Sequence, residues 1–355
     1  MSSNFNPEML ILARESRGLP QSELAAAAGV QQGTISKVES GVMIPSPELE
    51  ERFATSLDYP VALFRQTDRV YGFNSSVFFH RKRQSLPDRT LRKLHAYMNL
   101  TRMQVARLLR SIDISTPCRF QRIEPEEYGG RVEVVAQLVR STWRIPPGPV
   151  RNMIAAIEDA GGVVVSMDFE TRQADAISEW AEPSPPIFLI NSNSEITGDR
   201  LRLTLAHEVA HVVMHRFPNP KMEAQANTFA AEFLMPRKEI KASLYGLSFA
   251  KLMDLKSQWK VSMAALVQRA FELGTITDAQ RRYLFIQFGR RGYRLREPAE
   301  TDIPLERPEL FNELIETHLR DLGYAPGELA PSVMLLREDE FRSRHLEKNR
   351  LRLVG

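Results

Sequence analysis

Short apolar stripes separated by glycine residues organise the first part of the chain. The pattern predicts four helices, over residues 8–16, 21–28, 32–40 and 47–57. A glycine follows each of the first three and a proline opens the fourth, and these residue types commonly end and begin helices. We therefore expect residues 1–62 to form a compact all-helical domain.

A connector with a different charge balance follows, over residues 63–124. Acidic side chains outnumber basic ones in residues 1–58, whereas residues 59–100 are rich in lysine and arginine: Arg65, Arg69, Arg81, Lys82, Arg83, Arg89, Arg92 and Lys93. An amphipathic pattern then predicts one long helix over residues 88–111. The position of these charges is more informative about nucleic acid than the net charge of +3.

The hydrophobic pattern changes again in the segment that we assign to a second domain, residues 125–300. Helical periodicity occurs over residues 132–143, 149–160, 201–215 and 223–235, and again up to about residue 274 and over 308–322. Two aliphatic runs beside turn residues predict strands, at residues 162–167 and 186–191. The expected fold is mainly α with a small β-sheet (α+β), and residues 301–355 remain a helical segment of unknown role.

Composition narrows the class of protein. The chain of 355 residues is 43% hydrophobic and 26% charged, which is the balance of a globular protein of two or three domains. The sequence contains neither an apolar run of the length needed to span a bilayer nor a signal-peptide core near Met1. Cys118 is the single cysteine, which excludes an internal disulfide and a thiolate-rich metal site. We expect a cytoplasmic location and no membrane partner.

One helical segment carries the spacing of a metal site. His207 and His211 stand at positions i and i+4, so both imidazoles can reach one ion from the same helical face. Glu208, beside the first histidine, can hold a metal-bound water and take its proton, and zinc makes that proton acidic near neutral pH. An ordinary amphipathic helix with a chance His-Glu pair is the alternative. It is disfavoured because three of the seven histidines fall within nine residues here.

A hydrolytic zinc site needs a third protein ligand and an open fourth position. His215 lies about 12 Å from His207 along a helix axis, too far to share one ion, and is interpreted as exposed or packing. Glu223 is preferred, because it begins the next helix after a proline-containing turn that lets the chain double back. Glu232 would project from the opposite side of that helix, and Asn227 could support the carboxylate of Glu223.

The residues around this site resemble the ImmA/IrrE family of metallo-endopeptidases. The matching segments are Leu203 to Glu208, with its threonine-leucine-alanine lead into His-Glu-x-x-His, and Glu223 to Pro236, with Glu-x-x-Ala-Asn-x-Phe-Ala and a Leu-Met-Pro ending. The resemblance covers about residues 125–300 and implies a zincin-like domain that binds one Zn²⁺ per chain. By it, His207, His211 and Glu223 are the zinc ligands and Glu208 is the catalytic base. Gln225 departs from the pattern, since many members carry a glutamate there, and we expect little effect.

Residues 9–57 resemble the Xre/Cro-type helix-turn-helix family. The resemblance rests on residues 21–25, the Gly29-Val30 turn and residues 34–41. It implies that the helix after the turn enters the major groove of a double-stranded DNA operator, usually as part of a homodimer. The residues expected to contact DNA are Gln21, Gln31, Gln32, Thr34 and Lys37. The glutamines suit bidentate reading of adenine, while Gln21 and Lys37 could reach phosphates. A helical hairpin used for protein contacts is the alternative.

Several other patterns have ordinary explanations. Residues 81–83 are basic, and a solvated surface explains them better than a phosphate clamp. The arginine pairs at 281–282 and 290–291 flank aromatic residues, compatible with nucleic acid or with a helix and strand covering the core. The helix pair over 252–273 is interpreted as packing.

Together these features give two hypotheses. The first is a DNA-binding transcriptional regulator whose zinc-dependent endopeptidase cleaves a partner regulatory protein, a repressor or antitoxin, in a stress or mobile-element response. A substrate segment would add as a strand beside residues 186–191. The alternative is a non-catalytic antitoxin or repressor of a toxin-antitoxin module with a structural or vestigial metal site. The glutamate beside the first histidine favours the enzyme, because a structural site would not need it.

Overall fold

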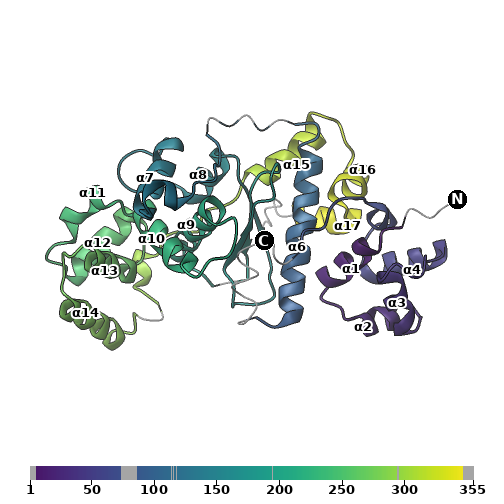
Figure 1. The fold of residues 1–355 in the computed structure, drawn as a ribbon, viewed down its shortest axis with the longest axis horizontal. Helices are drawn as coiled ribbons and strands as arrows, with labels where there is room; N and C mark the ends of the chain where they lie inside the picture. The colour runs from purple at the N-terminus through teal and green to yellow at the C-terminus, as the bar shows by residue number, and fades with distance from the viewer. Residues whose placement is uncertain are drawn as a thin grey trace, which may run out of the picture. The chain divides into compact units, whose positions relative to one another are not determined.

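The computed structural model describes residues 5–72, 86–112, 114, 116, 118–193, 195–293 and 296–346. The chain divides into two compact units, each of which is described by itself (Figure 1). The first unit joins Met1–Ile114 to Leu310–Gly355, and the second is Ser115–Glu309. The predicted fold class is confirmed: the chain is mainly helical, with one small sheet.

Four short helices form the amino-terminal part of the first unit: α1 Pro7–Ser16, α2 Gln21–Ala27, α3 Gln32–Glu39 and α4 Pro47–Leu57. Their bounds follow the predicted ranges closely. Gly29 adopts a φ of +65° in the turn between α2 and α3, a conformation that a side chain rarely allows. Leu24, Ile35 and Val38 are fully buried and pack α2 against α3.

The rest of the first unit contains one long helix and the end of the chain: α6 Asp88–Leu108, α15 Leu310–Arg320, α16 Pro326–Leu329, α17 Glu338–Phe341 and, after it, η7 Arg342–Leu346. The long helix was predicted over residues 88–111, which is three residues longer than the observed α6. Arg17, the C-cap residue of α1, donates to both carboxylate oxygens of Glu340, at 2.9 and 2.7 Å. Gln104 on α6 donates to the carbonyl of Met334 at 2.8 Å. Met334 and Glu340, both from the described part of the C-terminal region, therefore contact residues at the end of α1 and on α6.

The helices of the second unit are α7 Val132–Thr142, α8 Met153–Asp159, α9 Gly198–Met214, α10 Met222–Leu234, α11 Arg237–Ile240, α12 Phe249–Trp259, α13 Met263–Glu272 and α14 Asp278–Arg290. The prediction that a helix begins near residue 149 was wrong. Asn152 is the N-cap of α8 and accepts a hydrogen bond from the Ala155 amide at 3.0 Å, so the helix begins at Met153.

A sheet of three strands lies in the second unit: β1 Val163–Met167, β2 Ala176–Glu179 and β3 Ile187–Asn191. The strand order is β1-β3-β2, with β1 parallel and β2 antiparallel to β3. The expectation that a substrate strand adds beside residues 186–191 was wrong, because β3 is the central strand and both of its edges are paired. In the described part of the chain, β2 pairs with β3 alone.

A non-helical return segment, residues 302–309, follows the short turn Ala299–Thr301 and contacts two helices of the second unit, α8 and α9. Arg202 on α9 is 1% exposed and pairs with Glu306. The same glutamate accepts hydrogen bonds from the first two amides of α8, at 2.7 and 3.1 Å. A side chain at Gly198 would meet the carbonyl of Ile303 at 2.4 Å, so the start of α9 requires glycine. Just before this segment, Glu297 pairs with Lys256 on α12 at 2.7 Å.

Candidate metal centre and nucleic-acid interface

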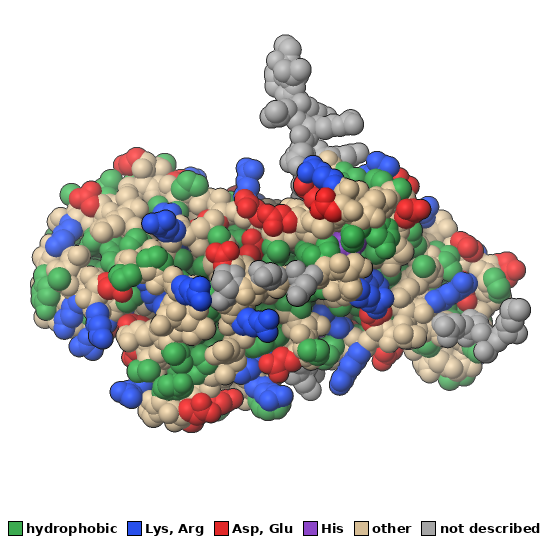
Figure 2. All heavy atoms as spheres, turned by 90° about the horizontal axis from the view of Figure 1, so that it is seen from above, with side chains coloured by type: hydrophobic (Ala, Val, Ile, Leu, Met, Phe, Trp, Pro, Cys, Tyr) green, Lys and Arg blue, Asp and Glu red, His purple; other side chains and the backbone are tan. Residues whose placement is uncertain are grey.

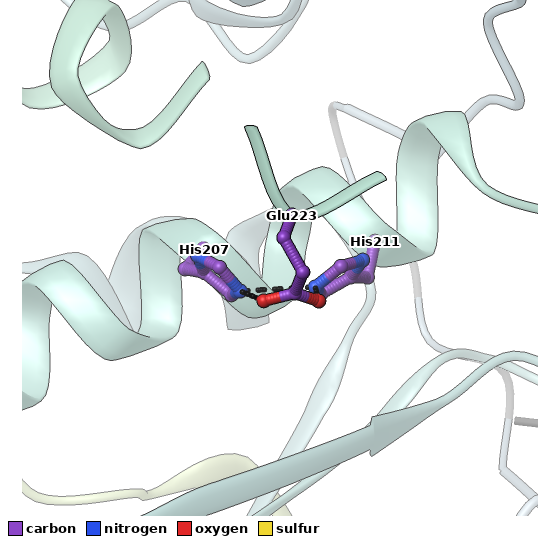
Figure 3. Close-up of side chains that lie close together, drawn as sticks. All are labelled: His207, His211 and Glu223. Carbon is purple, nitrogen blue, oxygen red and sulfur yellow. Dashed lines mark hydrogen bonds and ion pairs between the residues drawn. The ribbon is translucent and has the colours of Figure 1, made fainter. Parts of the chain in front are cut away.

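Two helices that pack against each other bring the predicted metal ligands together. His207 and His211 lie one turn apart on α9, and Glu223 lies in the first turn of α10 (Figure 3). The two Nε2 atoms are 2.9 Å apart. The carboxylate oxygens of Glu223 lie 3.6 Å from Nε2 of His207 and 3.5 Å from Nε2 of His211. The turn before α10 thus returns the chain to the histidine face of α9.

The spacing and chemistry of these atoms fit a zinc ion. Tetrahedral zinc with ligands at its usual bond lengths keeps them about 3.3 Å apart. The two Nε2 atoms are 2.9 Å apart, and each lies 3.5–3.6 Å from a different oxygen of the Glu223 carboxylate, distances close to that value. Two imidazole nitrogens and one carboxylate are a donor set typical of hydrolytic zinc sites. The side chain of Glu223 is 43% exposed whereas that of His211 is 5% exposed, so solvent reaches the cluster from the glutamate side.

Glu208 lies between the two histidines in sequence and is 1% exposed. Its carboxylate accepts a hydrogen bond of 2.6 Å from the hydroxyl of Ser178 on β2. This bond links the edge strand of the sheet to the helix of the metal cluster. Neither β2 nor Ser178 was predicted, because the strand reads Ala-Ile-Ser-Glu, which is neither an apolar run nor an alternation of apolar and polar residues.

Two further side chains of α10 were considered from the sequence: Asn227 as a support for Glu223, and Glu232 as a residue that points away from the site. Asn227, which was expected to support Glu223, contacts the candidate ligand His207, with its Oδ1 atom 3.0 Å from Nδ1 of the histidine. Glu232 is buried and pairs with Arg269 on α13, and it accepts a hydrogen bond from Gln137 at 2.8 Å. It takes no part in the cluster of three ligand residues.

His215 is not exposed but 3% accessible, immediately after the end of α9. Its Nδ1 atom lies 2.9 Å from Nδ1 of His211, and its Nε2 atom lies 3.1 Å from Oε1 of Gln225 on α10. Burial lowers the pKa of His215 below its usual value. His215 is eight residues from His207, too far to share an ion with it. It is four residues from His211, however, and this i, i+4 spacing permits a hydrogen bond between the two rings.

The predicted DNA-contacting residues lie at and around α3. Gln31, Gln32 and Lys37 are exposed, whereas Thr34 and Gln21 are half-buried. Gln21 donates a hydrogen bond to Glu39 at 2.7 Å and accepts one from Gln32 at 2.8 Å. Its side-chain amide therefore links the start of α2 to both ends of α3. The expected contact of Gln21 with phosphate stays a prediction.

In the described part of the connector, three basic residues pair with acidic residues of the first four helices, and the longest of these pairs is Arg89 with Glu23 at 4.0 Å. Arg65 pairs with Glu50 at 3.0 Å and Arg92 with Glu15 at 3.3 Å. In these pairs, part of the connector's positive charge is neutralised within the chain. On the face drawn in Figure 2, basic and acidic side chains are interspersed rather than gathered by sign. The basic residues 81–83 lie outside the described part of the chain.

Comparison with known families agrees with both resemblances. Residues 10–64 match the helix-turn-helix family model, and residues 157–271 match the peptidase M78 model, described as the IrrE N-terminal-like domain. The chain thus combines a helix-turn-helix domain of the DNA-binding type with a metallopeptidase-like domain, in that order. No curated protein matches the chain. Among the described residues, none of the helices has the length and apolar character required to cross a bilayer.

Proposed function

We propose that the protein is a DNA-binding transcriptional regulator whose second domain is a zinc-dependent endopeptidase. The observation that carries the proposal is the convergence of His207, His211 and Glu223, with Glu208 between the two histidines on the same helix. In this proposal the first three hold one zinc ion and Glu208 is the catalytic base.

Zinc in such a site supplies a Lewis acid that polarises the scissile carbonyl and makes a water acidic near neutral pH. The carboxylate of Glu208 would take the proton from the attacking water and deliver it to the leaving amine. Its hydrogen bond from Ser178 occupies one carboxylate oxygen and fixes the plane of the group. Burial of Glu208 keeps bulk water from competing for the same proton.

The substrate that fits this arrangement is an extended segment of a partner regulatory protein, a repressor or an antitoxin. Such a segment would pair with β2, which lies at the edge of the sheet and carries the serine that contacts Glu208. Backbone pairing along an edge strand holds a peptide irrespective of most side chains, so sequence preference would come from the flanking surface. We further propose that cleavage answers a stress or mobile-element signal.

The first domain would read a double-stranded operator with α3, as one half of a homodimer. The exposed Gln31, Gln32 and Lys37 support this proposal, since they stand on the solvent side of a helix whose other side is buried. Two copies would place two recognition helices on successive turns of the major groove.

The experiment that tests the peptidase uses E208Q to trap a partner protein by crosslinking in cells of the source organism. The captured protein is then incubated with zinc-loaded wild type, and the fragments are identified by mass spectrometry. E313Q, at an exposed glutamate on α15, is the matched control and should cleave as wild type does. A trapped partner that wild type leaves intact would contradict the peptidase assignment.

A further inference from the structure

A chain of three side chains extends from the metal cluster into the protein. His211 contacts His215 through their Nδ1 atoms at 2.9 Å, and His215 contacts Gln225 through Nε2 and Oε1 at 3.1 Å. We propose that His215 and Gln225 are positioning residues that fix the tautomer of His211 and thereby set the zinc affinity. The inference rests on the proposed function only for the zinc ion, not for peptide cleavage.

The donor and the acceptor in each of these hydrogen bonds follow from the number of protons on each ring. A neutral imidazole carries one N–H, and a histidine that binds zinc through Nε2 must carry it on Nδ1. His211 therefore donates from Nδ1, so that Nδ1 of His215 must accept and its proton must be on Nε2. That proton is donated to Oε1 of Gln225, an amide oxygen, which can only accept. Each hydrogen bond thus fixes the tautomer of the next histidine. In this arrangement the lone pair on Nε2 of His211 is free to bind zinc.

The same three residues have one other consistent arrangement. If the Gln225 amide rotates and donates from its nitrogen, His215 must accept at Nε2 and donate from Nδ1. His211 then accepts at Nδ1 and carries its proton on Nε2, which excludes zinc from that nitrogen. A glutamine allows both arrangements, whereas a carboxylate at position 225 allows only the one that favours zinc.

His207, the other proposed histidine ligand, is supported by an exposed residue, Asn227. Nδ1 of His207 lies 3.0 Å from Oδ1 of Asn227, and the asparagine is exposed. Water can replace an exposed acceptor of this kind. His215 is 3% accessible, so a lost acceptor at that position is not replaced by solvent. The zinc affinity should consequently depend more on His215 than on Asn227.

The first test measures zinc affinity by competition with a chromophoric chelator, on the full-length protein. The variants are H215F, which keeps a ring without an acceptor, Q225L, which keeps the volume without the amide, and Q225E. We expect H215F to weaken zinc binding by roughly 10- to 100-fold and Q225L by about 10-fold, the range seen for residues that support a metal ligand. Q225E should bind zinc at least as tightly as wild type.

Controls separate this idea from general destabilisation and from the proposed function. H318F changes another buried histidine, on α15 of the other unit, and should leave zinc affinity unaltered. N227A should weaken binding less than H215F. If both H215F and Q225L bind zinc as tightly as wild type and have normal circular dichroism, the positioning role of His215 and Gln225 is disproved. The peptidase proposal is then unaffected. A wild-type protein that binds no zinc overturns both.

The tautomer itself can be observed directly, which keeps the inference testable if H215F fails to fold. Long-range ¹H–¹⁵N spectra of histidine-labelled, zinc-loaded protein distinguish protonation at Nδ1 from protonation at Nε2. We expect the proton of His215 on Nε2 and that of His211 on Nδ1. A His215 ring that carries its proton on Nδ1 in the zinc-loaded wild type would disprove the proposed direction.

Discussion

The hydroxyl of Ser178 lies 2.6 Å from a carboxylate oxygen of Glu208, so the edge strand β2 holds the proposed base of the metal helix. Both residues are buried, and the bond therefore is not exchanged for one with solvent. The relationship predicts that the serine orients the base without taking part in metal binding.

We expect S178A to lower kcat on an identified substrate by roughly 10- to 100-fold, since a misoriented base loses part of the 10²- to 10⁴-fold that general-base catalysis supplies. KM and zinc affinity should change little, and S178T, which keeps the hydroxyl, should recover most of the rate. S166A, at an exposed serine on β1, is the control. Equal rates for S178A and wild type would disprove the orienting role.

Two substitutions in the metal cluster should have separable effects. H207A removes a ligand, so elemental analysis of zinc-reloaded protein should fall from about one equivalent to well below it. E208Q should retain the metal and abolish cleavage, because it removes only the base. Full zinc retention by H207A would contradict the ligand assignment, and cleavage of the physiological substrate by E208Q would contradict the mechanism.

Base reading by α3 predicts a loss of specificity rather than of general affinity. Q31A and Q32A should each weaken operator binding by roughly 1–3 kcal/mol per lost bidentate contact and leave binding to unrelated DNA nearly unchanged. Fluorescence anisotropy at one fixed salt concentration measures both. T55A, at an exposed position of α4, should behave as wild type. If operator and unrelated DNA are weakened alike, these glutamines do not read bases.

The stability of the first unit should fall as the pH is lowered. Burial lowers the pKa of His95 on α6 below its usual value of 6.5, while its Nε2 atom is hydrogen-bonded to the carbonyl of Tyr71. The unfolded chain then binds a proton at a higher pH than the folded one, so this contribution is present above about pH 6.5 and is lost as the pH falls below it.

The measurement is urea unfolding of metal-free protein between pH 8 and pH 5. H95Q, which keeps an N–H donor but does not titrate, should show a smaller decrease in unfolding free energy over that range than wild type. An identical pH dependence in the two proteins would show that His95 does not titrate between the folded and unfolded states.

Local signals account for the parts of the fold that the sequence predicts well. Glycine at helix ends located the first helices within a few residues, and the i, i+4 histidines located α9. Glu223 was selected because a turn precedes it, and the structure places it at the two histidines. These inferences needed only neighbours along the chain.

The parts that were missed depend on contacts between distant segments. All four residues of β2 are buried, so the strand lacks the alternation that identifies strands, and Ser178 was lost with it. Asn227 and Gln225 have clear positions on α10, but which histidine each contacts depends on side-chain direction across two packed helices. The distance between His215 and His207 argues against metal binding by His215. The same distance says nothing about the contact that His215 makes with His211.

The return segment also determines how the peptidase-like domain can be separated from its neighbour. The family match ends at residue 271, but the counterion of Arg202 is Glu306. An expression fragment that stops at the match would bury a guanidinium without its carboxylate, a defect of about 3–5 kcal/mol. A fragment meant to fold by itself should therefore extend past the family match to at least Glu306.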